Sequence, residues 1–182
     1  GPAWSRARAD GNLSLDDALE HIQDIVEATD VPVNADFESG FAQSAAGIAD
    51  NIRKAVDTGA AGISLEDASG IASNPLRDIG SSIARLQVAR AVLDGYGPDA
   101  PLLIGRAENF SAGRPDLEDT MVRLRAYAEA GADVLYAPGV STREEIAALV
   151  DAVHPKPLDV LVGPGTALGF REIAPLGVGR IS

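Results

Sequence analysis

The sequence of 182 residues contains no cysteine, only two histidines and a single tryptophan. Without cysteine the chain can form no disulfide, zinc–thiolate site or catalytic thiol. Its apolar stretches are far shorter than the roughly 20 residues of a membrane-spanning helix, and no signal peptide is recognisable. Basic residues are also few, since 15 Lys and Arg stand against 27 Asp and Glu, a net charge of −12. We therefore expect a cytoplasmic protein that binds neither nucleic acid nor membranes.

Short aliphatic runs alternate with amphipathic stretches along the chain, a pattern that is typical of repeated strand–helix units. Helices are predicted at 15–28, 44–58, 75–93, 116–130, 141–153 and 167–174, and strands at 31–37, 62–66, 102–106, 134–137, 158–162 and 179–181. Ser14 and Asp116 are the expected N-caps of the first and fourth helices. Ser141 and Glu144 fit a capping box at the start of the fifth.

Strands that are separated by helices run parallel with right-handed crossovers, which leaves an open doubly wound sheet or a closed barrel. The first strand is followed by no glycine-rich dinucleotide fingerprint, which argues against the open sheet. A closed (β/α)8 TIM-type barrel normally has eight strands and about 250 residues. The sequence therefore predicts a single α/β domain over residues 1–182. Its fold is expected to be a TIM-type barrel that is truncated to about six βα units.

Acidic side chains follow neighbouring predicted strands at their carboxyl ends, where β/α barrels place their active sites. Asp36 and Glu38 are two residues apart and share one face of the first strand, and Glu66 ends the second. Converging carboxylates repel one another, and a hard cation such as Mg²⁺, or Mn²⁺ in its place, relieves that repulsion. We predict a metal site at these three residues; solvated loop residues that cap the following helices are the alternative.

Arg106 and Glu108 share a face at the end of the third predicted strand, so an arginine lies beside the predicted metal. A guanidinium binds a carboxylate in bidentate fashion, so metal and arginine together suit a substrate carboxylate. Arg106 is the predicted catalytic and substrate-binding residue and Glu108 a second catalytic residue, unless the two form a structural ion pair. Asn74 is a further predicted substrate contact, in the loop 67–75, which suits a mobile lid or a passive connection equally. Asp67 is expected to support the site rather than bind the metal.

Other polar residues carry weaker signals. His21 and His154 are expected to be ordinary surface residues, and Tyr136 a packing residue. The segment Gly163–Thr166 is interpreted as a plain turn, although it could face a phosphate. Two alternatives follow: a phosphate-binding barrel isomerase that uses this turn, or a non-catalytic barrel. Neither accounts for the acidic residues at successive strand ends.

Four segments of the sequence match the motifs of a known superfamily, and they occur in the same order as in that superfamily: 36–41 (DFESGF), 59–67 (GAAGISLED), 105–110 (GRAENF) and 127–133 (YAEAGAD). Together they resemble the isocitrate lyase/phosphoenolpyruvate mutase superfamily, and the similarity covers nearly the whole chain from about residue 10. The resemblance implies a metal-dependent barrel that acts on 2-oxo acids. It also implies a homotetramer in which neighbouring subunits exchange a C-terminal helix.

The resemblance also implies roles for individual residues. Asp36, Glu38 and Glu66 match the acidic positions that bind magnesium, mostly through water, and Arg106 matches the arginine that binds the substrate carboxylate. The loop 67–75 departs from the family, since it lacks the lysine of the lyases and mutases and the cysteine of the lyases. That departure favours the carboxyphosphonate mutase-like and oxaloacetate decarboxylase-like branch.

The expected activity is that of an Mg²⁺-dependent lyase or mutase-like enzyme acting on a small 2-oxo carboxylate. The reaction would cleave a carbon–carbon bond or decarboxylate at C3, through an enolate that the metal stabilises. Decarboxylation needs no general acid while the bond breaks, so it is compatible with the missing lysine and cysteine.

Overall fold

Six parallel strands follow one another in chain order, β1-β2-β3-β4-β5-β6, across one sheet in a computed structural model of the protein. The structure describes residues 13–163 and 168–182. The strands are β1 (Asn34–Asp36), β2 (Gly62–Glu66), β3 (Leu102–Arg106), β4 (Val134–Tyr136), β5 (Leu158–Val160) and β6 (Arg180–Ile181). The helices are α2 (Leu15–Glu27), α3 (Ala45–Asp57), α4 (Ile79–Leu93), α5 (Leu117–Glu129), α6 (Arg143–Val153) and α7 (Phe170–Ile173), with 3-10 turns η1 (Asp94–Asp99) and η2 (Ala174–Leu176).

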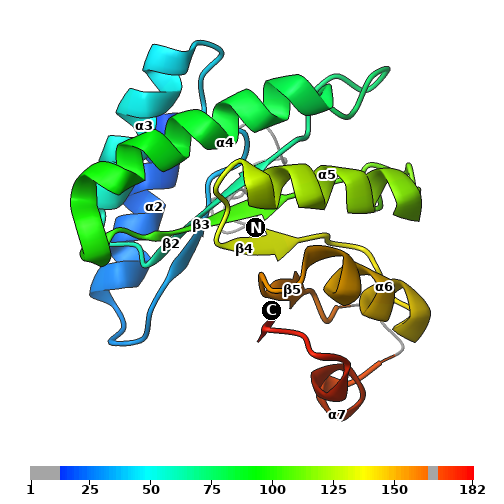
Figure 1. Ribbon diagram of the computed structural model, residues 1–182. Helices are drawn as coiled ribbons and strands as arrows, with labels where there is room; N and C mark the ends of the chain where they lie inside the picture. The colour runs from blue at the N-terminus through cyan, green and yellow to red at the C-terminus, as the bar shows by residue number, and fades with distance from the viewer. Residues whose placement is uncertain (1–12, 164–167) are drawn as a thin grey trace.

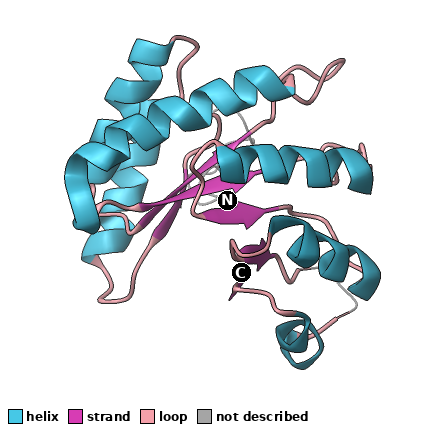
Figure 2. Ribbon diagram, in the orientation of Figure 1, coloured by secondary structure: helices cyan, strands magenta, loops and turns pink. Residues whose placement is uncertain are grey.

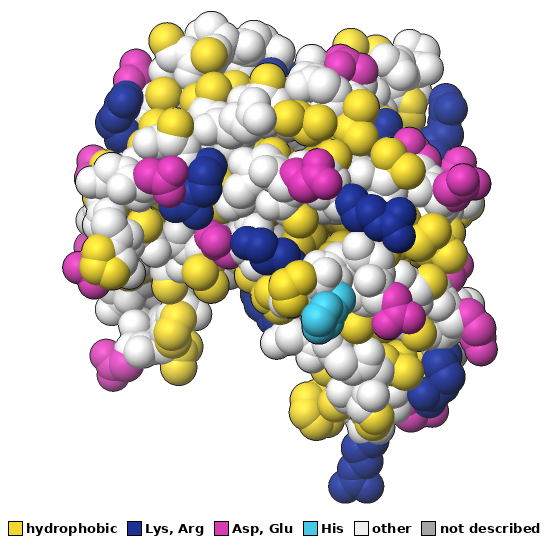
Figure 3. Space-filling view, viewed as in Figure 1, with side chains coloured by type: hydrophobic (Ala, Val, Ile, Leu, Met, Phe, Trp, Pro, Cys, Tyr) yellow, Lys and Arg dark blue, Asp and Glu magenta, His cyan; other side chains and the backbone are white. Residues whose placement is uncertain are grey.

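The sheet curls into part of a barrel, with the helices on its outer side (Figures 1 and 2). Neighbouring strands are also neighbours in sequence, as in a barrel and unlike a doubly wound sheet. Figure 3 shows a hollow on the open side, between the part that holds α2 and α3 and the part that holds α6 and α7. The prediction of a truncated TIM-type α/β fold is confirmed.

The outer face of the sheet forms the apolar core against the helices. Its side chains are buried at successive registers, among them Ile63, Leu65, Leu103, Leu135 and Leu158. Gly105 lies in the same row, and a Cβ at this position would be 3.0 Å from Cβ of Tyr127 and 3.1 Å from Cβ of Ala132. Helix α5 therefore approaches β3 closely because Gly105 has no side chain.

The inner face carries a polar row. Glu66, Arg106 and Tyr136 occupy matching positions on β2, β3 and β4. Asp159 and Arg180 continue the row on β5 and β6. Because paired residues of parallel strands point to the same side of the sheet, these five side chains face the interior of the curve.

Several helix starts differ from the sequence predictions, and two of them show why. Helix α4 begins at Ile79 rather than at residue 75, because Asp78 accepts the N–H of Ser81 at 2.8 Å and forms the N-cap. Leu76 instead forms an isolated antiparallel bridge with Ala68. At α6 the capping box is formed by Thr142 and Glu145, one residue later than predicted. Both pairs have the same spacing, so the motif alone could not choose between them.

The first strand is shorter than predicted, Asn34–Asp36 instead of 31–37. Pro32 has no N–H to donate to a sheet ladder, and Val31 is 67% exposed. The predicted caps Ser14 and Asp116 are confirmed, since each accepts the N–H of the residue three positions later. Among the described residues, no helix is both long enough and apolar enough to span a membrane.

Candidate active site

The guanidinium of Arg106 lies among three carboxylates from three strand ends. Its Nη1 donates to Oδ2 of Asp36 at 3.1 Å and lies 3.5 Å from Oε2 of Glu66. Its Nε donates to Oε1 of Glu108, and its Cζ lies 5.3 Å from the ring centroid of Tyr136. The structure thus brings together four of the residues that the sequence singles out, at the carboxyl ends of β1, β2 and β3.

Burial and crowding disfavour negative charge on these carboxyls. Burial raises the pKa of Glu66 from 4.5 to about 8, and the charges of Glu108, Asp36 and Glu38 add to the rise. Arg106 opposes it without cancelling it. Burial likewise raises the pKa of Glu108 against the opposing effect of Arg106. One guanidinium therefore does not offset the acidic groups around it, and a further cation would.

The residues suit a magnesium ion held largely by water. Across residues 13–163 and 168–182, no group of three or more His, Cys, Asp or Glu side chains is arranged to hold a metal directly. Mg²⁺ commonly needs only one or two carboxylates and keeps several waters. Asp36 and Glu66, which meet at one nitrogen of Arg106, fit that mode of binding.

Glu38 occupies an unusual backbone position beside this pair. Its φ is +43°, in the left-handed region that non-glycine residues rarely adopt. Its N–H donates to Oδ1 of Asp36 at 3.3 Å, and its carbonyl accepts the N–H of Glu66 at 2.9 Å. These two hydrogen bonds fix the turn after β1 to both neighbouring acidic residues. Backbone strain such as the positive φ of Glu38 concentrates at functional sites. The metal-binding role of Glu38 stays a prediction.

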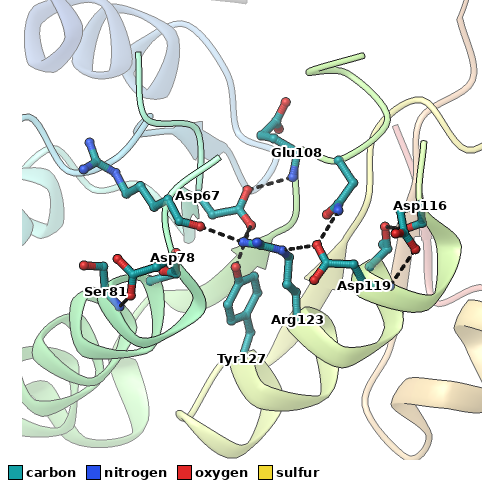
Figure 4. Close-up of polar contacts among 12 residues, drawn as sticks. Asp67, Asp78, Ser81, Glu108, Asp116, Asp119, Arg123 and Tyr127 are labelled. Carbon is teal, nitrogen blue, oxygen red and sulfur yellow. Dashed lines mark hydrogen bonds and ion pairs between the residues drawn. The ribbon is translucent and has the colours of Figure 1, made fainter. Parts of the chain in front are cut away.

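Asp67, the residue after Glu66, is the centre of a buried polar network (Figure 4). Its Oδ1 accepts the N–H of Glu108 at 2.8 Å, and its Oδ2 accepts Nη1 of Arg123 at 2.9 Å and the hydroxyl of Tyr127 at 2.6 Å. Its side chain is 1% exposed, and both oxygens are used by the protein. These contacts agree with a supporting role for Asp67 rather than a ligand role.

Asn74 lies apart from Arg106. It is exposed and lines a groove of about 610 Å³ that Arg77, Asn109 and Arg123 also line. Arg106 lines a different, small cavity. The structure therefore does not bring this predicted substrate contact to the carboxylate cluster, and its role stays a prediction.

Neither histidine lies at a strand end, since His21 is on α2 and His154 is the C-cap of α6. His154 is exposed, and His21 is half-buried on α2. The predicted phosphate turn at Gly163–Thr166 falls almost wholly on residues 164–167, outside the described part of the chain.

Several residues of this region had no predicted part in the site. Tyr136 contacts Arg106 from the next strand, and Asp159 is buried on β5 with its Oδ2 2.9 Å from Nη1 of Arg180. The signal that could have found them is their pairing in the sheet, because Tyr136 pairs with Arg106 and Asp159 pairs with Tyr136. Arg123 gave no such signal, because a lone arginine on an amphipathic helix is usually a surface residue.

The family model described as phosphoenolpyruvate phosphomutase matches residues 1–182. An oxaloacetate decarboxylase from Rhodopseudomonas palustris (strain BisA53) is 30% identical over 86% of this chain and 53% of its own length. A 2-methylisocitrate lyase from Escherichia coli (strain K12) is 27% identical over 79% of this chain and 49% of its own. The chain thus spans about half the length of the curated relatives it matches.

Solved structures agree with the fold. A protein from Burkholderia cenocepacia J2315 with a provisional lyase/mutase description is 42% identical, with a TM-score of 0.92 over 98% of this chain and 64% of its own. A phosphonopyruvate hydrolase solved with oxalate and Mg²⁺ is 28% identical, with a TM-score of 0.85 over 98% of this chain and 63% of its own.

Proposed function

Because the chain belongs to the phosphoenolpyruvate phosphomutase family, we propose that it forms the cation and carboxylate site of an Mg²⁺-dependent lyase acting on a small 2-oxo carboxylate. The observation that carries the proposal is the convergence of Asp36, Glu66 and Glu108 on Arg106. Relatives named oxaloacetate decarboxylase and 2-methylisocitrate lyase support the substrate class. The metal, with Mn²⁺ as a substitute, and assembly into a homotetramer belong to the same proposal.

Each residue has a separate part in this proposal. Asp36 and Glu66 hold the cation, with Glu38 acting through water. When bound, Mg²⁺ supplies a Lewis acid for the 2-oxo group. Arg106 binds the substrate carboxylate and stabilises the negative charge that develops on the enolate more strongly than it stabilises the starting ketone. Glu108 orients the guanidinium through its contact with Nε.

Decarboxylation is the reaction that these residues support best. The bond between C3 and its carboxylate breaks, its electron pair forms the enolate, and CO₂ leaves. This step needs no general acid, and the loop 67–75 offers neither lysine nor cysteine. Cleavage of a 3-hydroxy acid would instead need a base for the hydroxyl, and Glu108 is the available carboxyl.

The first experiment measures the binding of oxalate, a planar mimic of the pyruvate enolate, by calorimetry with and without Mg²⁺. We expect binding that requires Mg²⁺ and that Asp36→Ala abolishes. The control variant is Asp50→Ala, which removes an exposed aspartate on α3 that pairs with Arg53. Absence of Mg²⁺-dependent binding in the protein at its natural length would leave the phosphate-binding or non-catalytic barrel.

A second experiment separates the reactions. Oxaloacetate and 2-methylisocitrate are supplied with Mg²⁺, and the release of CO₂ is compared with the formation of succinate, because both reactions form pyruvate. We expect turnover of oxaloacetate. Turnover of 2-methylisocitrate alone would contradict the decarboxylation proposal while preserving the site.

A further inference from the structure

Arg123 of α5 donates hydrogen bonds to three residues near the proposed active site. Its Nη1 donates to Oδ2 of Asp67 and to the carbonyl of Arg77, both at 2.9 Å. Its Nε donates to Oδ2 of Asp119 at 2.6 Å, and the same oxygen accepts Nδ2 of Asn109 at 2.7 Å. One side chain thus joins both ends of the segment 67–77 and, through Asp119, the segment that follows Glu108 (Figure 4).

The segment 67–77 is closed at its base by its own backbone. The N–H of Arg77 donates to the carbonyl of Asp67 at 2.8 Å, and the N–H of Ser69 donates to the carbonyl of Pro75 at 2.8 Å. Asn74 lies within this closed loop. The position of the loop relative to the sheet therefore depends on what holds Asp67 and Arg77, and Arg123 binds both.

Asp67 carries the connection into the carboxylate cluster. The oxygen that Arg123 does not bind accepts the N–H of Glu108 at 2.8 Å. Glu108 in turn contacts Nε of Arg106. Tyr127, one turn after Arg123 on α5, donates its hydroxyl to the same Asp67 oxygen as Arg123 at 2.6 Å. A continuous chain of hydrogen bonds therefore runs from the loop to the guanidinium of Arg106.

We propose that Arg123 is a positioning residue, which through Asp67 sets the loop 67–77 and Glu108 at a fixed distance from one another. The proposal rests on the proposed function, because it assigns to Arg123 the alignment of the loop with the Mg²⁺ and carboxylate site. Arg123 contacts neither metal nor substrate in this proposal. It acts through Asp67 on one side and the Arg77 carbonyl on the other.

The chemistry of the guanidinium explains why arginine occupies this position. Its planar fork donates from separate nitrogens in fixed directions, here toward Asp119 from Nε and toward Asp67 and Arg77 from Nη1. A lysine keeps the charge but presents a single nitrogen on a flexible stem. Arg123→Lys should therefore still neutralise Asp67 while losing the simultaneous contacts, which makes it a sharper test than removal of the charge.

The experiment compares Arg123→Lys with Arg125→Lys in the protein at its natural length. Arg125 lies on the same helix, is exposed, and donates Nε to the carbonyl of Ala152 at 3.2 Å, away from the network. Hydrogen exchange is measured at the backbone amides of Arg77 and Glu108. The first donates to the backbone carbonyl of Asp67 and the second to its side chain. Calorimetry with oxalate and Mg²⁺ gives the dissociation constant and, separately, the stoichiometry.

For Arg123→Lys we expect faster exchange at both amides and a dissociation constant about 10- to 100-fold higher with unchanged stoichiometry. Arg125→Lys should match the unmodified protein in both measurements. A variant that is merely destabilised shows lower stoichiometry with an unchanged dissociation constant, and this result overturns the proposal. Unchanged exchange at Arg77 and Glu108 overturns it as well.

The outcomes also separate this proposal from the proposed function. If the unmodified protein shows no Mg²⁺-dependent oxalate binding, the proposed function fails, and exchange at the two amides alone decides whether Arg123 fixes the loop. If oxalate binds with Mg²⁺ and Arg123→Lys changes neither exchange nor affinity, only the positioning role fails.

Discussion

A carboxylate at the end of a buried strand is stable in its charged form only when cations lie near it. Glu66 is in this position, and its pKa of about 8 shows that the burial is only partly offset by Arg106. A residue that is unfavourable for stability and well placed for a cation is typical of functional sites. Stability and metal binding should therefore respond in opposite directions when the carboxyl of Glu66 is replaced by an amide.

Glu66→Gln tests this directly. In metal-free buffer near neutral pH we expect the free energy of unfolding in urea to equal or exceed that of the unmodified protein, because a carboxyl whose pKa is raised on folding costs stability at that pH and an amide does not ionise. Mg²⁺-dependent oxalate affinity should fall at least about tenfold, since loss of even an outer partner of a metal site has that effect. Glu129→Gln, at an exposed position on α5, is the control. Undiminished oxalate affinity in Glu66→Gln would contradict its assignment as a metal ligand.

Gly105 offers a second prediction on packing. A methyl group there would meet Tyr127 and Ala132 at 3.0–3.1 Å, so Gly105→Ala should lower the free energy of unfolding by about 1–3 kcal/mol. Gly95→Ala is the matched control, because nothing lies within 4 Å of the added Cβ. Equal stability of the two variants in urea unfolding would show that α5 can move away from β3.

The acidic strand ends could be predicted from spacing alone, because period two and parallel pairing place Asp36, Glu66 and Arg106 at one edge. The sequence could not show that Arg106 bridges the acids, since side-chain rotamers decide that contact. Nor could it predict the network around Asp67, because the partners Arg123 and Tyr127 are 56 and 60 residues away in the chain.

At the scale of elements, every predicted strand and helix appears in the described residues, and the errors lie at the ends. Hydrophobic periodicity reports which residues face the core, whereas a boundary depends on one local hydrogen bond. Helix α4 shows the difference, since Pro75 is a favourable helix start by type but Asp78 provides the cap. Leu76, two residues before this cap, forms a bridge with Ala68 instead.

The capping box of α6 gives a pH-dependent prediction. Partial burial of Glu145 raises its pKa, but the N–H groups of Thr142 and Ser141 lower it by more, so the net pKa lies below 4.5. A depressed folded-state pKa contributes stability that is present above the unfolded value and lost as pH falls through the folded one. In urea unfolding, Glu145→Ala should thus be less stable than the unmodified protein near neutral pH, by about 0.3–1.5 kcal/mol. The difference should shrink as pH falls below 4.5, and a difference independent of pH would contradict the ionic cap.

At the scale of the whole molecule, cations should stabilise the folded protein in two ways. With a net charge of −12, any salt weakens self-repulsion, whereas the proposed site binds Mg²⁺ specifically. A ligand present at 100 times its dissociation constant stabilises the folded state by about 2.7 kcal/mol. We therefore expect Mg²⁺ to raise the melting temperature more than NaCl of equal ionic strength. Asp36→Ala should remove that excess, and an equal effect of the two salts would contradict a specific site.

The barrel-like order of the strands could also be predicted from the sequence, because strand–helix alternation without a dinucleotide fingerprint leaves few topologies. The inner polar row could not be predicted in full. Asp159 and Arg180 lie on short strands, and a shift of one residue in either would turn their side chains to the outer face. Only the pairing of β4 with β5 and of β5 with β6 fixes that register.

The bridging position of Arg106 has a consequence for the order of binding. Its guanidinium is held by carboxylates of the protein itself, so these groups act as an internal competitor for any incoming acid. A divalent ion that engages Asp36 and Glu66 releases the guanidinium from that competition. Ion and acid should then bind with positive cooperativity, each tightening the other by the same factor, and the route in which the ion enters first should carry most of the flux.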